Sequence, residues 1–184
     1  MPQCARLLSF YESPFCGRFM KTLEKIRLTA YLRLFSFLRI PLLGWVRPSI
    51  IEMNEHKTVL AIPLSRRSRN HIGVMYFGAL AMGGEAAVAF PAVLEIQKSG
   101  KPVTFLFKNF KADFKKRCEG DVHFLCDQGA EVRELIHRAI QNPGERFEGE
   151  FQSRAVVPSV DANEVAATFT LTLSTKLNIR KPKA

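Results

Sequence analysis

The chain has 184 residues, 47% of them hydrophobic, which is enough for one sizeable core and too little for two independent ones. Its 27 lysines and arginines outnumber the 17 aspartates and glutamates, so the formal net charge is +10 and an anionic partner is favoured. Charge alone does not choose between the phosphates of a small ligand, a nucleic acid and an anionic membrane surface.

No secretory signal is expected in this sequence. Glu12 and Pro14 interrupt the apolar run that a secretory signal needs. The four cysteines are too sparse for a secreted disulfide scaffold and show no close metal-ligand pair. A reducing cytoplasm is therefore the expected location.

The N-terminal quarter is expected to form a helical extension over residues 1–46. Residues 14–38 predict an amphipathic helix, whose apolar positions are Phe15, Phe19, Leu23 and Ile26. The following apolar stretch, residues 31–46, is broken by Pro41 and Gly44 and is too short to span a bilayer. It is expected either to pack on the domain or to make a peripheral membrane contact.

Residues 47–179 are expected to form the main domain, which begins with a hairpin. Residues 50–53 and 58–64 flank the polar turn 54–57 and together predict two paired strands. A basic loop with Arg66, Arg67 and Arg69 comes next.

The segment 72–94 is the most informative, because it is apolar on every side and Glu85 is its only acidic or basic residue. A helix of this composition is a buried helix. Its length also allows a membrane-spanning interpretation, against which Glu85, Pro91 and several small residues argue.

Four strands and one short helix complete the domain. The expected strands are residues 103–114, 122–126, 147–157 and 165–173, with a helix over residues 132–140 between the second and third. The first of these strands changes its apolar phase near Lys108 and Asn109, which predicts a β-bulge. The result is an α+β domain in which an antiparallel sheet covers one buried helix, followed by a basic tail, residues 180–184.

A single carboxylate in an apolar helix needs an explanation, because an unpaired buried charge costs several kcal/mol unless the group takes up a proton or finds a partner. Burial raises the pKa of a carboxyl group toward the range that suits a general base or nucleophile. Glu85 is therefore the first candidate for catalysis, and the alternative is a structural pairing with a basic side chain or with backbone amides.

The segment from Asn70 to Ala87 resembles the central-helix signature of PaaI-like hotdog thioesterases, most closely the YiiD C-terminal-like branch. Asn70 and Gly73 match the opening of that signature, Gly78 matches its last glycine, and Glu85 falls on its acidic position. The resemblance implies a hotdog fold, an antiparallel β-sheet wrapped around a central buried α-helix, over roughly residues 47–178.

The resemblance also implies a function, the hydrolysis of acyl-CoA or a related thioester without metal or other cofactor, CoA being part of the substrate. Glu85 would act as base or nucleophile from across the interface of a homodimer or a dimer of dimers. The backbone N–H of Gly78 would polarise the carbonyl, and Asn70 would position water or, alternatively, cap the turn before the helix.

Tyr76 and Phe77 stand where the family has a histidine and its first glycine. Both are expected next to the substrate, where their bulk narrows the approach to the helix amides. This departure favours a second hypothesis, a non-catalytic acyl-binding or structural hotdog module. Nearby His71 is either a proton acceptor that contacts the substrate or a structural residue of the turn.

The arginines of the basic loop, Arg66, Arg67 and Arg69, are candidates for binding CoA phosphates, or they belong to a solvated loop. A second basic group, Lys108, Lys111 and residues 115–117, has the ordinary interpretation of a protected sheet edge. Nucleic acid is not an expected partner. The scattered histidines show no metal-ligand spacing, and serine-hydrolase, P-loop and dinucleotide-binding motifs are missing.

Overall fold

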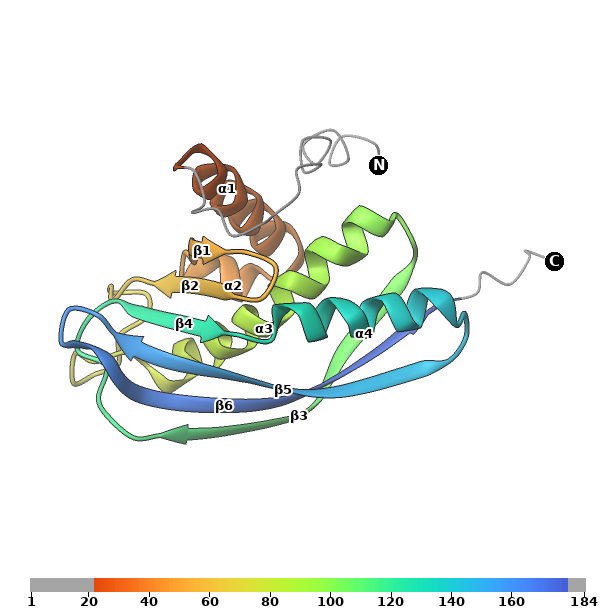
Figure 1. Ribbon diagram of the computed structural model, residues 1–184. Helices are drawn as coiled ribbons and strands as arrows, with labels where there is room; N and C mark the ends of the chain where they lie inside the picture. Colours follow the sequence, from red (N-terminus) through yellow and green to blue (C-terminus); the bar gives the residue numbers. More distant parts are fainter. Residues whose placement is uncertain (1–21, 179–184) are drawn as a thin grey trace.

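The computed structural model describes residues 22–178, which form one antiparallel sheet, one long buried helix and three further helices (Figure 1). In chain order the elements are α1 (Thr22–Arg39), α2 (Pro41–Trp45), β1 (Ser49–Met53), β2 (Thr58–Ile62), α3 (Phe77–Ser99), β3 (Val103–Phe114), β4 (Val122–Cys126), α4 (Gly129–Gln141), β5 (Arg146–Val157) and β6 (Asp161–Leu177). The strand order in the sheet is β1-β2-β4-β5-β6-β3.

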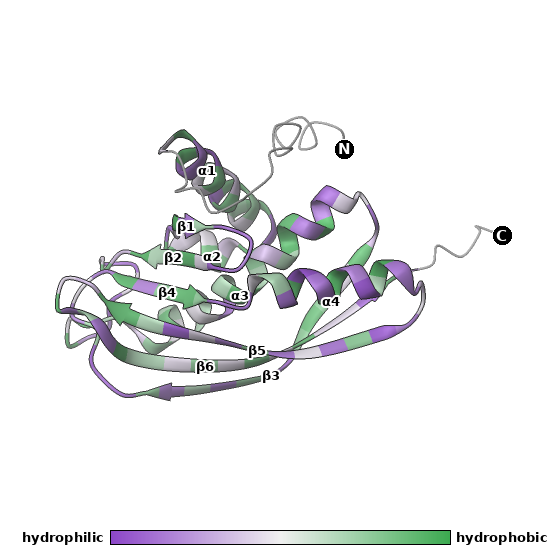
Figure 2. Cartoon of the chain, in the orientation of Figure 1, coloured by the Kyte–Doolittle hydropathy of each residue, from purple (hydrophilic) through white to green (hydrophobic). Residues whose placement is uncertain are grey.

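The sheet curves around α3, which contacts β2, β4, β5, β6 and α4. The hotdog fold implied by the resemblance is therefore confirmed. Figure 2 shows hydrophobic residues along α3, and twelve of its residues are buried. Within the described part of the chain, α3 is the one helix long and apolar enough to cross a membrane, but its burial inside the curved sheet identifies it as the core helix.

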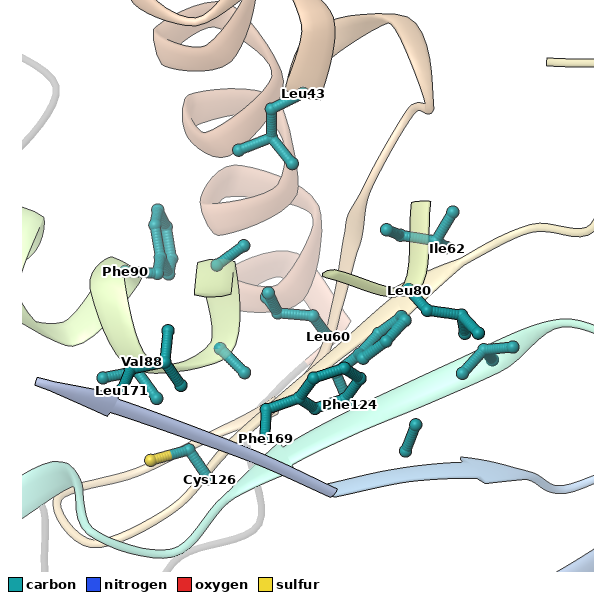
Figure 3. Close-up of a cluster of buried hydrophobic side chains, with 14 of the residues drawn as sticks. Leu43, Leu60, Ile62, Leu80, Val88, Phe90, Phe124, Cys126, Phe169 and Leu171 are labelled. Carbon is teal, nitrogen blue, oxygen red and sulfur yellow. The ribbon is translucent and has the colours of Figure 1, made fainter. Parts of the chain in front are cut away.

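Two adjacent glycines let α3 lie directly on the sheet. A Cβ atom on Gly83 would lie 2.3 Å from the Phe124 ring, and one on Gly84 would lie 2.6 Å from Phe169. The two rings lie next to each other in the core (Figure 3). The hydroxyl of Ser153 on β5 also donates a 2.8 Å hydrogen bond to the Gly84 carbonyl, so helix and sheet are joined at this point.

The predicted strands are confirmed, including the irregularity in β3. The pairing of β3 with β6 shifts register between Phe107 and Asn109, where the apolar phase of the sequence changes. Because one extra residue is accommodated there, Phe107 before the bulge and Phe110 after it both face α3 and the core.

The predicted start of the central helix at residue 72 is wrong, since α3 begins at Phe77 and continues to Ser99. The intervening residues form a turn instead. Gly73 has a φ of 88°, and Met75 forms a β-bridge with Arg69. Positive φ is unfavourable for residues other than glycine, so the chain is directed away from a helix here.

The prediction for the first helix is partly corrected. Its residues 14–21 lie outside the described part of the chain, and α1 ends at Arg39. Leu23 and Ile26, two of the apolar positions of the predicted helix, are exposed, whereas the opposite face, Leu28, Leu32 and Ser36, is buried. The basic tail, residues 180–184, also lies outside the described residues.

Side-chain hydrogen bonds hold α1 against the start of the sheet. The Thr29 hydroxyl accepts a hydrogen bond from the amide of Ile50, and Arg33 Nε donates to the Pro48 carbonyl, both at 3.0 Å. Leu43 and Val46 are buried beside them. The stretch 31–46 thus packs on the domain through one face.

Candidate functional site

Glu85 lies at an open hollow of about 380 Å³ between α3 and β3. Ala81 and Met82 line it from the helix, one turn before Glu85. Phe107 and Phe110 line it from the strand, on either side of the bulge. The walls are therefore almost entirely apolar, and the carboxylate is the one ionisable group among the lining residues.

The carboxylate of Glu85 has no hydrogen-bond or ion-pair partner among residues 22–178. The structural pairing considered for it is thus not found in the described part of the chain. Burial removes water from the carboxylate and raises the pKa of Glu85 above its ordinary value. A side chain of this kind binds protons more readily than an exposed glutamate, as a general base requires.

Two backbone amides in the first turn of α3 donate no hydrogen bond within the described structure. The N–H groups of Ala79 and Leu80 donate to the Tyr76 carbonyl, while those of Phe77 and Gly78, at the open end of the helix, have no such acceptor among residues 22–178. Amides at a helix N-terminus point outward and favour negative charge. The Gly78 amide is therefore available for a hydrogen bond to a negatively charged group.

The ring of Tyr76 lies over Gly78, where a Cβ would meet it at 2.5 Å. Tyr76 also packs against Phe77, with ring centroids 4.7 Å apart, and Phe77 packs edge-on against Phe114 of β3. All three rings are partly exposed. Access to the Gly78 amide thus passes along an aromatic wall, which agrees with the narrow approach expected from the sequence.

The side chain of Asn70 organises the turn before α3. Its Oδ1 accepts hydrogen bonds from the amides of Ile72 at 3.0 Å and Val74 at 3.3 Å. This is the turn-capping role considered as the alternative to positioning water. His71 is an exposed residue of the same turn.

The basic loop lies beside the start of α3, because the carbonyl of Ser68 accepts a hydrogen bond from the Tyr76 amide. Arg66, Arg67 and Arg69 are exposed. Arg67 stacks over Trp45 of α2, with its guanidinium carbon 4.7 Å from the ring centroid. The loop therefore connects the α3 N-terminus to α2.

The candidate residues form two groups on α3. Asn70, Tyr76, Phe77 and Gly78 surround its N-terminus. Glu85 lies seven residues further on, or about 10 Å along the axis at 1.5 Å per residue. One chain therefore does not bring the acid and the Gly78 amide to the same reacting atom.

Three wall residues of the hollow, Met82, Phe107 and Phe110, were not predicted as site residues. The phase change in β3 is the signal that brings the two phenylalanines to the hollow, although sequence alone does not show what they face. Across the described residues 22–178, no group of three or more His, Cys, Asp or Glu side chains could hold a metal ion.

The family model for a domain of unknown function (DUF4442) matches residues 29–172. The chain belongs to the DUF4442 family. No curated protein matches it. Solved structures of several thioesterase-family proteins share its hotdog fold.

Three solved structures illustrate the likeness. A protein of unknown function from Chlorobaculum tepidum has a TM-score of 0.69 at 11% identity, covering 84% of this chain and 97% of its own. A thioesterase family protein from Silicibacter pomeroyi scores 0.59 at 17%, covering 81% and 98%. A thioesterase from Haemophilus influenzae scores 0.58 at 13%, covering 90% and 99%. At these identities the likeness shows the fold.

The raised pKa of Glu85 predicts a pH-dependent contribution to stability. The folded state binds this proton more tightly than the unfolded chain, so the free energy of unfolding should fall as pH rises from the ordinary carboxyl range through the raised pKa. The Glu85→Gln variant should lack this decrease. Urea unfolding of both proteins at a series of pH values measures the difference, and a difference that does not change with pH would contradict the assignment.

Proposed function

We propose that the protein is a thioester hydrolase that cleaves acyl-CoA or a related thioester, with Glu85 as its general base. The observation that carries the proposal is the unpartnered carboxylate of Glu85 in an apolar hollow, on the central helix of a thioesterase-type fold. An apolar hollow suits the acyl chain, and a partly buried base suits the activation of water.

The chemistry requires only groups of the protein, water and substrate. Glu85 takes a proton from water while the water oxygen attacks the thioester carbonyl. The negative charge that develops on the carbonyl oxygen is stabilised by the amide N–H of Gly78. The carbon–sulfur bond then breaks, and the thiolate leaves with the proton that Glu85 returns. The products are a carboxylic acid and a free thiol.

A second copy of the chain is part of the proposal. Reacting atoms must lie about 3–3.5 Å apart, whereas Gly78 and Glu85 of one chain are separated by about 10 Å along α3. Glu85 of one protomer therefore acts beside the α3 N-terminus of the other, in a homodimer or a dimer of dimers.

The edge strand β3 is the surface that we assign to this contact. It ends the sheet and pairs only with β6 among the described strands. Leu106, Phe110 and Phe114 are exposed on it, and Phe77 lies next to Phe114. An exposed edge with apolar side chains is a template for pairing with another strand. A dimer formed there covers these side chains and closes the hollow.

We assign the phosphates of CoA to the basic loop beside the α3 N-terminus, since Arg66 and Arg69 are exposed there. The enzyme would work in the reducing cytoplasm, which agrees with the free thiols of Cys118 and Cys126.

The second candidate function is a non-catalytic acyl-binding module. The Tyr76 ring beside Gly78 favours it, because this ring narrows the space at the start of α3.

Glu85→Gln should leave the protein folded and lower kcat for acyl-CoA hydrolysis roughly a hundredfold or more, because the amide does not accept a proton. The rate at which free thiol is released from a panel of acyl-CoA substrates measures kcat. Glu95→Gln is the matched control: Glu95 is a buried acid on the same helix, 3.1 Å from His137 and outside the hollow. Equal loss in both variants, or none in Glu85→Gln, argues against Glu85 as base. If the wild type binds acyl-CoA without turnover, the acyl-binding module is supported.

Light scattering at micromolar concentration should show a dimer or a dimer of dimers. Leu106→Glu should shift the protein toward monomer and reduce turnover, because it places a charge in the β3 contact. Leu23→Glu adds the same charge to an exposed leucine of α1 and should do neither. A wild-type monomer that is fully active would rule out the shared site.

The combined change of Arg66, Arg67 and Arg69 to alanine should raise KM for acyl-CoA and weaken its dependence on salt, with acyl-chain preference unchanged. A single change should have little effect, because an exposed ion pair contributes at most about 1 kcal/mol. The control is the triple alanine variant of residues 115–117, which removes the same charge. Equal increases in KM would indicate a general field effect instead of a phosphate site.

A further inference from the structure

The outer side of α1 and α2 exposes an unusual number of large apolar side chains. They are Leu23, Ile26, Leu34, Phe37, Leu38, Leu42 and Trp45, called here the α1–α2 surface. Phe37 is 72% exposed, Leu42 is 67% exposed and Trp45 is 58% exposed. Single exposed apolar residues are common, but this many on two adjoining helices indicate a surface that is covered in use.

The apolar positions of α1 form a continuous stripe. Leu23, Ile26, Leu34 and Phe37 recur at helical spacing on the face opposite to Leu28 and Leu32, which pack on the sheet. At the end of the stripe, α2 packs closely on α1, since a Cβ on Gly44 would lie 3.0 Å from the backbone nitrogen of Phe37. The α1–α2 surface is therefore held in place by the fold.

The charges around this surface are mostly positive, and Glu24 in the first turn of α1 is the one acidic residue of the two helices. Residues 25–51 contain no acidic residue and five basic ones, Lys25, Arg27, Arg33, Arg39 and Arg47. Arg67 of the basic loop adds one more positive charge, because its guanidinium stacks on Trp45 itself. A second copy of the same surface would bring like charges together, whereas an anionic surface would complement them.

We propose that the α1–α2 surface docks on an anionic lipid bilayer. Large apolar side chains enter the boundary between headgroups and acyl chains, the tryptophan ring lies at headgroup level, and arginines contact lipid phosphates. In Figure 1, α1 lies at the β1 side of the sheet and β3 at the other side. Docking through α1 and α2 thus leaves β3 and the Glu85 hollow free, and the inference does not depend on the thioesterase proposal.

Trp45 is the only tryptophan of the chain and reports directly on the docking. The full-length protein is mixed with phosphatidylcholine vesicles that contain about a third phosphatidylserine, at about 0.1 M salt. We expect co-sedimentation with the vesicles, a blue shift of the Trp45 emission, and quenching by lipids brominated on their acyl chains. Pure phosphatidylcholine vesicles, or about 0.5 M salt, should weaken binding severalfold.

The test variant is Phe37→Glu/Leu42→Glu, which changes two exposed residues and should reduce vesicle binding roughly tenfold or more. Its matched control, Val160→Glu/Ala162→Glu, adds the same charge in and beside the β5–β6 turn, where Val160 is 66% exposed. The control should bind vesicles nearly as the wild type does. Circular dichroism verifies that both variants are folded, and the Trp45 quenching is measured on the wild type without any substitution.

Three outcomes would overturn the proposal. The first is a wild-type protein that neither co-sediments with anionic vesicles nor shows quenching of Trp45. The second is an equal loss of binding in the test variant and its control, which would show that binding depends on net charge and not on the α1–α2 surface. The third is a test variant that keeps vesicle binding but changes the oligomeric state, which would identify the α1–α2 surface as a contact between copies of the chain.

Discussion

The close approach of α3 to the sheet at Gly83 and Gly84 is the constraint on which the rest of the structure depends. Neither residue has a Cβ, so the helix backbone lies against the Phe124 and Phe169 rings instead of being held away from them. Glu85 follows the pair directly. The packing that forms the core therefore also carries a carboxylate to the border between α3 and β3, the edge strand at which the sheet ends.

Much of the fold could be predicted from periodicity. The bulge in β3 could be predicted because the inward-facing positions change from the Phe107 phase to the Phe110 phase. The buried helix α3 could be predicted because a helix that is apolar on every side must be buried. Its start was missed because Ile72 and Met75 continue the apolar pattern. Their turn depends on the Asn70 side chain and on the bridge from Arg69 to Met75, which propensity does not describe.

The candidate site and the α1–α2 surface could also be predicted only in part from the sequence. Glu85 could be singled out because a lone carboxylate in an apolar helix is costly wherever it lies. The aromatic wall that it faces comes from a distant strand and required the tertiary structure. The orientation of α1 could not be predicted because both of its faces are apolar, so that spacing alone does not distinguish Leu28, which is buried, from Ile26, which is exposed.

The hydrogen bond from Ser153 to the Gly84 carbonyl has a consequence for motion. It ties the peptide unit just before Glu85 to a central strand, and with the neighbouring rings it makes the helix side of the hollow rigid. The opposite side is the edge strand β3, whose hydrogen-bond ladder is already interrupted after Phe107. Within a single protomer, opening of the hollow therefore occurs on the β3 side, and the β3 amides should exchange with solvent earlier there than those of α3.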